Sequence, residues 1–419
     1  MNRLVLIGNG FDLAHGLKTS YADFIDWYWE QKWREIALTY NYICEDKLSR
    51  FEIISGDTRS WQVIYHYNHI KFKDLKARDI FEVIIKNNEY FKVSFVPFFQ
   101  NILKSIETKG WVDIENEYYK LLEQHSIINY STKEIEKLNK QLQYLQELLT
   151  KYLTEINQQD ISVDMIIKDK IYSPIETSDI SIEGKSTWNK YINACAIKDK
   201  DFWDGRLRDY GIIGPNRESF INEIDNFNHL TEFFPDIPRP YRLPESIMLL
   251  DFNYTKTVNR YMKTEDIFIH NQIHGRIEAP ESMIFGYGDE FDEKYRKLQD
   301  LNNNDCLTNI KTIKYQESDN YRKVLQFIES APFQVCIMGH SCGNSDRTLL
   351  NTIFEHKNCI SIKPYYYKKS DGTDNYIELI QNISRNFKDM KLMRDRVVNK
   401  MYCEPLSGEK PGKDKGMVH

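Results

Sequence analysis

Leu4-Val5-Leu6-Ile7-Gly8-Asn9-Gly10-Phe11-Asp12 opens the chain. The apolar run predicts a buried β-strand, and the two glycines after it predict a sharp turn into a helix. In α/β folds such a turn brings backbone amides and a helix N-terminus close to a phosphate. The dinucleotide fingerprint GxGxxG is incomplete, because Leu13 stands at its third glycine. A nucleotide site and a tight turn without a ligand therefore both remain open. Since the strand begins at residue 4, we expect no leader and no regulatory arm before it.

Composition narrows the class of protein. The 419 residues are 41% hydrophobic and 28% charged, which is typical of a globular protein of two or three domains. The net charge of −6 argues against broad nucleic-acid binding. Neither a signal-peptide pattern nor an apolar stretch of about 18 residues occurs, so we expect no membrane span. Seven cysteines without a CxxC pair argue for reduced thiols, no zinc ribbon, no metal site and a cytoplasmic location.

Strand and helix patterns define the expected organisation. After a proline-rich stretch at 235–244, short apolar runs at 247–250, 267–269, 283–285 and 335–338 alternate with helical segments. This alternation predicts an α/β fold with a mostly parallel sheet flanked by helices. We assign residues 1–35 plus 240–400 to this domain and residues 36–239 to a mostly helical insertion. Residues 404–419, rich in glycine and lysine, are expected to be a disordered tail.

One helix of the insertion carries a clear pattern. Ser131-Thr132-Lys133-Glu134 is a capping box. Apolar residues follow at a spacing close to three and four: Ile135, Leu138, Leu142, Leu145, Leu149 and Ile156. The pattern fits an amphipathic helix packed on its own domain. It also fits a short coiled-coil seam through which copies of the chain associate.

Two polar positions follow apolar runs in the second half of the chain. Asn253, in Phe252-Asn253-Tyr254-Thr255, can hold a ribose hydroxyl or a water molecule, or it can form a turn. His274, beside Gly275, is a candidate general base, because imidazole titrates near neutrality. A buried structural histidine is the alternative. His270 and His274 are also spaced like a helical metal pair, but no companion ligand is evident.

Gly339-His340-Ser341-Cys342-Gly343 matches the GxSxG nucleophile elbow of serine hydrolases. A triad with Ser341 needs a partner acid and a histidine on later loops, and Asp346 and His356 follow too closely along the chain. The alternative is a second glycine turn that helps to cradle a nucleotide.

A nuclease would need clustered carboxylates. Asp113 and Glu117, four residues apart, share a helix face, while Glu115 points elsewhere. A solvated helix face is the default interpretation of this spacing.

Together these motifs resemble the bacteriophage abortive infection AbiH family. The resemblance rests on Asn9-Gly10-Phe11-Asp12 with Gly16, Thr19, Tyr21 and Phe24, on residues 111–118, on Phe252-Asn253-Tyr254-Thr255, on His274-Gly275 and on Gly339-His340-Ser341 with Asp346. It implies an intracellular anti-phage protein that responds to a phage trigger protein.

The same order of motifs is distantly similar to a sirtuin-type, Rossmann-like NAD-binding fold. This similarity implies NAD as substrate or ligand, with Asn253 positioning water and His274 as the base. It places the remaining residues around the nucleotide: Gly8, Asn9, Gly10, Phe11, Asp12, Tyr254, Gly275, Gly339, His340, Ser341 and Asp346. Thr255 stands where related NAD hydrolases tend to have Asp, and the paired zinc cysteines of sirtuin deacylases are absent.

The implied activity is hydrolysis of NAD to nicotinamide and ADP-ribose. Two alternatives remain. One is a nucleotide-sensing and protein-interaction module without catalysis, which would assemble through the helical insertion as a homo-oligomer. The other is a serine hydrolase that uses Ser341.

Overall fold

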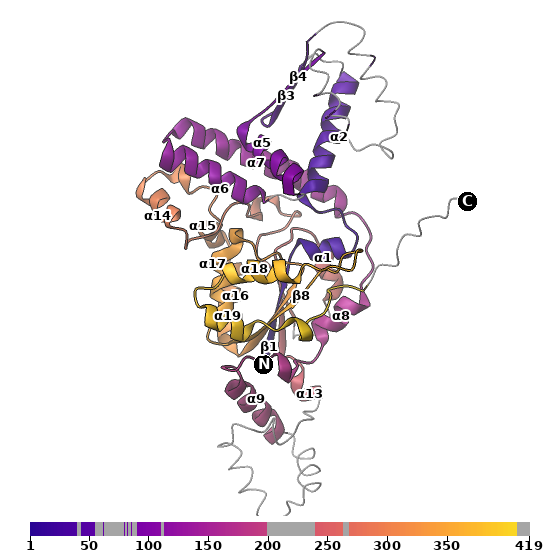
Figure 1. The fold of residues 1–419 in the computed structure, drawn as a ribbon, viewed down its shortest axis with the longest axis vertical. Helices are drawn as coiled ribbons and strands as arrows, with labels where there is room; N and C mark the ends of the chain where they lie inside the picture. The colour runs from indigo at the N-terminus through magenta and orange to yellow at the C-terminus, as the bar shows by residue number, and fades with distance from the viewer. Residues whose placement is uncertain are drawn as a thin grey trace, which may run out of the picture.

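A five-stranded parallel sheet forms the centre of the computed structural model (Figure 1). The structure describes residues 1–39, 43–54, 90–109, 113–198, 239–262 and 268–408, with four single positions between 55 and 89. The strands lie in the order β6-β5-β1-β7-β8. Their bounds are β1 (Asn2–Ile7), β5 (Ser246–Asp251), β6 (Phe268–Gln272), β7 (Phe333–Met338) and β8 (Cys359–Tyr365). The predicted α/β class, with a mostly parallel sheet flanked by helices, is confirmed.

Both faces of the sheet are covered, which explains why β1 is apolar without alternation. On one face, Val5 and Ile7 pack against α1 (Asn9–Ala14) and α8 (Met165–Tyr172). On the other face, Leu4 and Leu6 share a core with later helices. These helices are α16 (Asn320–Ser330), α17 (Arg347–Phe354), α18 (Tyr376–Arg385) and α19 (Met390–Arg396).

The insertion is mixed rather than purely helical. Its helices are α2 (Tyr21–Thr39), α5 (Pro97–Lys109), α6 (Ile114–Glu123) and α7 (Thr132–Ile156), with a π-helical turn η1 (Gln124–Ile128). A small antiparallel sheet of β2 (Ile43–Glu45), β3 (Ser49–Ile53) and β4 (Phe91–Phe95) lies beside them (Figure 1). Alternating buried positions along β3 show why this segment pairs as a strand, with one face on the helices.

The predicted helix with its apolar stripe is α7. Ser131 caps it by accepting a hydrogen bond from the Glu134 amide. Its six stripe residues are all buried, in the same core as Phe24 and Trp27 of α2. The stripe is therefore packed within its own chain, as the first of the two sequence interpretations expects.

Packing divides the chain differently from the sequence assignment of residues 1–35 and 36–239. Helix α2 belongs to the core of α5, α6 and α7 because its aromatic residues, such as Trp33, face them. Conversely, α8 and α9 (Lys185–Lys198) of the insertion pack on the sheet. Trp188 of α9 contacts the cluster of Met1 and Ile360.

One predicted strand is absent from the structure, and one strand of the sheet was not predicted. Residues 283–285 are buried but form no strand, because their backbone groups bond to other parts of the site. The Ile284 amide donates to His274 O, and the Ile284 carbonyl accepts from the Tyr254 hydroxyl. Strand β8 is missed by the sequence patterns. The remaining short elements are η2 (Thr177–Asp179), α13 (Arg239–Arg242), η3 (Thr257–Tyr261), η4 (Pro280–Ser282), α14 (Glu293–Asp300), η5 (Asn304–Cys306), α15 (Lys311–Lys314), η6 (Tyr315–Glu317), η7 (Asn344–Asp346) and η8 (Lys400–Tyr402).

Part of the expected tail is ordered. The Leu406 amide donates to Tyr366 O over 2.8 Å, and the Leu406 side chain is buried. Disorder is therefore the wrong description for residues 404–408. Residues 409–419 lie outside the part of the chain that the structure describes. The same holds for Trp111, for Ile267 and for residues 201–238, which include the first two prolines of the predicted connection.

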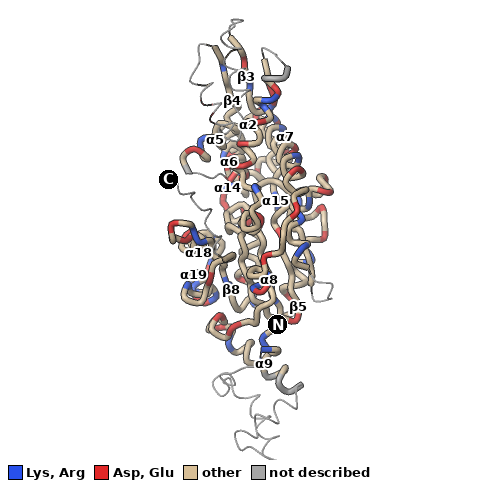
Figure 2. The backbone as a smooth tube through the Cα atoms, turned by 90° about the vertical axis from the view of Figure 1, so that its right-hand side faces the viewer, with Lys and Arg blue, Asp and Glu red and all other residues tan. Residues whose placement is uncertain are grey.

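Basic and acidic residues are interspersed along the described chain (Figure 2). Among the described helices, not one has the length and apolar character needed to cross a membrane.

Candidate functional site

The carboxyl ends of β5, β1 and β7 meet at one edge of the sheet. Gly8 follows β1, Asn253 follows β5 after Phe252, and Gly339 follows β7. The Asn253 side chain donates to Gly8 O over 3.0 Å, and the Asn253 amide bonds to the Asp251 carboxylate. Asn253 therefore joins two adjacent strand ends, as its sequence position after an apolar run suggests.

The two glycine turns pack directly on each other. The Gly10 amide donates to Gly339 O over 2.8 Å, and the Gly8 amide donates to Met338 O over 3.3 Å. Gly339 has φ +78°, and a Cβ there would lie 2.1 Å from the Phe11 nitrogen. A Cβ on Gly8 would lie 2.5 Å from the His340 Cα. The close approach of two loops thus requires these glycines, whether or not a ligand binds beside them.

The other residues of the first motif, Asn9, Phe11 and Asp12, lie in three different environments. Asn9 is exposed, and its side chain accepts from the Thr19 hydroxyl over 2.6 Å. Phe11 is fully buried against Tyr261, with ring centroids 5.2 Å apart. Asp12 is buried and accepts from Thr255 over 2.7 Å, while its other oxygen has no hydrogen-bond partner. Burial raises the pKa of Asp12 to about 7, with the Thr257 and Thr255 hydroxyls opposing the shift.

A buried ionic network centres on Asp346, in η7 just after the turn that follows β7. Lys311 Nζ of α15 lies 2.9 Å from Asp346 Oδ1, and His274 Nε2 lies 3.1 Å from the same oxygen. His340 Nε2 lies 3.6 Å from Asp346 Oδ2. On its other side, Lys311 contacts Glu115 of α6 over 2.9 Å. The network therefore links the sheet edge to the insertion.

The neighbours of each group set its protonation. Burial alone would lower the pKa of Lys311, but Asp346 and Glu115 outweigh burial and raise it. Burial alone would raise the pKa of Asp346, yet Lys311 and His274 hold it well below its usual range. Burial and the nearby Lys311 lower the pKa of His274. At neutral pH the arrangement is thus an ionised Asp346, a charged Lys311 and a neutral His274.

Glu115 is the group in this network that titrates near neutrality. Burial raises its pKa to about 7, against the attraction of Lys311. Its second oxygen accepts from the Gly286 amide over 3.1 Å. A carboxyl group with a pKa near the working pH can give or take a proton, which is the property of a general acid or base.

Aromatic rings enclose the two histidines. The Phe252 ring lies 4.0 Å from the His340 ring and 5.2 Å from the His274 ring, centroid to centroid. The Tyr315 hydroxyl lies 3.4 Å from His274 Nε2. The His340 Nδ1 accepts from the Cys342 amide over 3.0 Å, so its Nε2 carries the proton that faces Asp346. These contacts fix both rings in place.

The structure brings together most of the residues expected from the sequence. Gly8, Gly10, Asn253, His274, Gly339, His340 and Asp346 form one connected cluster of contacts. Tyr254 and Gly275 flank it: the Tyr254 hydroxyl bonds to Ile284 O, and Gly275 has φ +79° against Ser282. Asn9, Phe11 and Asp12 instead contact Thr19, Tyr261 and Thr255.

Lys311 and Glu115 are the functional candidates that sequence reasoning missed. Glu115 lies in the segment predicted to present Asp113 and Glu117 on one face, with Glu115 turned away from them. In the structure Asp113 caps α6, Glu117 pairs with Lys120, and it is Glu115 that enters the network. The sequence indicated that Glu115 points away from Asp113 and Glu117, but it did not indicate that Glu115 contacts Lys311.

Two chemical alternatives find little support in the described residues. Ser341 is exposed, and its hydroxyl has no histidine ring nitrogen within hydrogen-bond distance there. Positive φ angles occur at Gly339 and Cys342, whereas a nucleophile elbow places the strain at the serine. His270 bonds to Asp251 at 3.2 Å, and in the part of the chain that is described no three His, Cys, Asp or Glu side chains are placed so that they could hold a metal ion.

Comparisons with known proteins add one finding. The family model described as Bacteriophage abortive infection AbiH matches residues 4–367, which include every member of the cluster. No curated protein and no solved structure matches the chain.

Proposed function

The chain belongs to the bacteriophage abortive infection AbiH family, and we propose that it acts against phage by hydrolysing a nucleotide at the Asp346 network. The membership indicates the anti-phage role. NAD is the first substrate to consider, with nicotinamide and ADP-ribose as products. The reaction is placed inside the cell, where NAD and phage components are both present.

The observation that carries this proposal is the contact of His274 with Asp346 at the edge where three parallel strands end. The order β6-β5-β1-β7-β8 corresponds to the third, second, first, fourth and fifth strands of the sheet along the chain. This is the order of doubly wound nucleotide-binding sheets, whose ligands bind where the order reverses, here between β1 and β7. A sirtuin-type, Rossmann-like fold is the finer form of this proposal.

The residues have distinct roles in this reaction. Ionised Asp346 accepts a hydrogen bond from the Nε2–H of neutral His274, so Nδ1 is left to accept a proton from water. Water oxygen bonds to the anomeric carbon as the bond to the nicotinamide nitrogen breaks, and nicotinamide leaves as a neutral molecule. Asn253 orients water or a ribose hydroxyl, and Lys311 keeps Asp346 ionised.

The glycine turns limit how a nucleotide enters. Because the Gly10 amide is bonded to Gly339 O, phosphates that approach Gly8 and Gly10 have to displace residues 339–343. A phage trigger protein that moves this loop would couple infection to activity. We therefore expect low activity in the isolated chain and higher activity in infected cells.

The test measures nicotinamide release by the full chain and the NAD content of infected and uninfected cells that express it. His274→Asn should lower turnover about 100-fold or more, as expected for loss of a general base. His356→Asn, which changes a histidine outside the cluster that pairs with the exposed Glu329, is the matched control and should leave turnover unchanged. Circular dichroism verifies that both variants fold. Unchanged NAD in infected cells and no nicotinamide in vitro would refute hydrolysis of NAD.

A second candidate is a nucleotide sensor without catalysis. The observation in its favour is the burial of His274, Lys311 and Asp346, each no more than 10% exposed in its side chain. Calorimetry of the full chain with NAD and ATP separates the two candidates. Binding without turnover, in the presence of infected-cell extract, identifies the sensor.

A further inference from the structure

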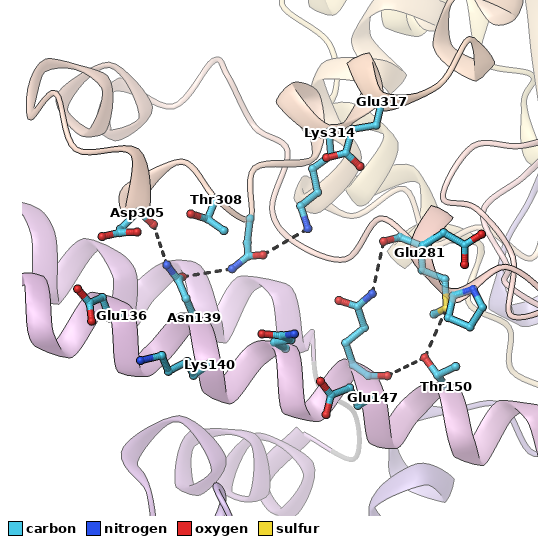
Figure 3. A pocket seen from close by; sticks show the side chains of 15 residues that line it. Glu136, Asn139, Lys140, Glu147, Thr150, Glu281, Asp305, Thr308, Lys314 and Glu317 are labelled. Atoms are coloured by element: carbon cyan, nitrogen blue, oxygen red, sulfur yellow. Dashed lines mark hydrogen bonds between the residues drawn. The ribbon is translucent and has the colours of Figure 1, made fainter.

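A cleft of about 770 Å³ lies between α7 and residues 280–317 (Figure 3). Polar side chains of α7 form one wall, and the segment that runs from η4 to η6 forms the other. The lining includes Glu136, Asn139, Glu147, Glu281, Asn309 and Lys314. The volume falls in the range of ligand-binding pockets.

Hydrogen bonds hold the two walls together. Asn139 of α7 donates to Asp305 O over 2.9 Å and accepts from the Asn309 side chain over 3.2 Å (Figure 3). Further along α7, the Gln146 side chain donates to Met283 O over 3.4 Å. The cleft is thus formed without a ligand, so binding there requires little reorganisation.

Unpaired negative charge dominates this cleft. Five carboxylates line it together with two lysines, Lys140 and Lys314; the carboxylates are Glu136, Glu147, Glu281, Asp305 and Glu317. Within the described residues, none of the five forms an ion pair, although the charge of Glu317 acts at longer range on Lys314. Elsewhere the exposed Glu329 contacts both His356 and Lys357. A ligand with ammonium or guanidinium groups would supply the missing counter-charges.

The same wall is connected to the Asp346 network. Asn309 and Lys314 line the cleft, and the Lys314 Nζ lies 3.4 Å from Asn309 Oδ1. Lys311, which lies between these two residues along the chain, contacts Glu115 and Asp346. Tyr315, the residue after Lys314, contacts His274. A ligand that bonds to Asn309, or that brings positive charge next to Lys314, therefore acts on the short helix that carries Lys311.

We propose that this cleft binds a basic segment of a partner protein and that its occupancy is transmitted to the Asp346 network through residues 309–315. The amide side chains pair with the backbone of the segment, and the carboxylates pair with its Lys or Arg side chains. The proposal does not depend on NAD hydrolysis, because binding is measured without substrate.

The probe is an eight-residue peptide of alternating lysine and glycine, added to the full chain and followed by calorimetry. The cleft variant combines Glu136→Gln, Glu147→Gln and Glu281→Gln. The control variant combines Glu107→Gln, Glu183→Gln and Glu378→Gln, which neutralises three exposed carboxylates outside the cleft lining. We expect roughly tenfold weaker binding for the cleft variant, and affinity within twofold of the unmodified chain for the control.

Hydrogen exchange measured with and without the peptide tests the transmission. Residues 309–315 should change protection when the peptide binds the unmodified chain, and should not change in the cleft variant. Equal affinities for the two triple variants would show non-specific attraction to a negatively charged protein and overturn the site. Binding at the cleft with unchanged exchange at 309–315 would overturn the transmission. Both outcomes leave the hydrolysis proposal standing.

Discussion

Replacing Lys311 by Met tests the ionic network most directly. Lys311 is 2% exposed in its side chain and contacts Glu115 and Asp346, both at 2.9 Å. Met fills a similar volume but leaves two buried carboxylates without their shared cation. Removing one partner of a buried pair costs about 3–5 kcal/mol. We therefore expect the free energy of unfolding of Lys311→Met to fall by about this amount at pH 8.

The loss should depend on pH in a defined direction. In the unmodified chain Asp346 has a lowered pKa, so its stabilisation is present above the unfolded value of about 3.9 and is lost as pH falls through the folded pKa. Without Lys311, burial raises the pKa of Asp346 and raises that of Glu115 further. The folded variant then binds more protons than the unfolded chain above about pH 4, and its stability falls as pH rises. Its deficit should therefore be smaller at pH 5 than at pH 8.

The assay is urea unfolding followed by tryptophan fluorescence at both pH values. Adding Glu115→Gln to Lys311→Met should recover part of the loss, because one uncompensated charge disappears. Lys323→Met is the matched control: Lys323 is 50% exposed in its side chain and pairs with Asp319 on the surface, so we expect less than about 1 kcal/mol. A deficit below about 1 kcal/mol for Lys311→Met, or one equal at pH 5 and pH 8, would refute the reasoning.

Three further outcomes are expected. Gly339→Ala should destabilise the fold by about 3 kcal/mol or more, since its Cβ would lie 2.1 Å from the Phe11 nitrogen at φ +78°. Gly372→Ala, at φ +85° but in open space, should cost only about 1 kcal/mol; similar melting temperatures for the two would contradict the packing argument. Asp12→Asn should flatten the fall in stability between about pH 4 and pH 7, because folded Asp12, with a pKa of about 7, holds a proton that the unfolded chain has lost; unfolding titrations that keep the slope would count against it. Leu145→Ala should cost about 2–5 kcal/mol without changing the sedimentation coefficient, because its side chain is buried within one chain; dissociation of an oligomer would assign the stripe to an interface instead.

Local patterns account for what the sequence predicted well. The apolar run at β1, the glycines after it and the stripe of α7 follow from rules that span only a few residues. The same kind of rule explains why Asn253 and His274 lie near the sheet edge: each follows an apolar run, and parallel strands present the side chains after them at one edge.

Long-range packing accounts for what was missed. Lys311 lies on α15, a helix of four residues, which is too short to show a periodic pattern. Its burial depends on Glu115, 196 positions away along the chain. Residues 283–285 look like a strand because they are apolar, yet their backbone bonds to loops and side chains. Composition cannot distinguish a buried strand from a buried irregular segment, since both are apolar.

The position of β1 also has a consequence for the order in which the protein is made. β1 leaves the ribosome before the other strands of its sheet, but its partners there are residues 246–251 and 333–338. At about 5–20 residues per second, β1 waits roughly 15 to 65 seconds before β7 has been translated. Lys311 and Asp346 are added still later than β5, so an incomplete chain lacks the ionic network. A protein that acts against infected cells would thus carry no assembled site while it is still being synthesised.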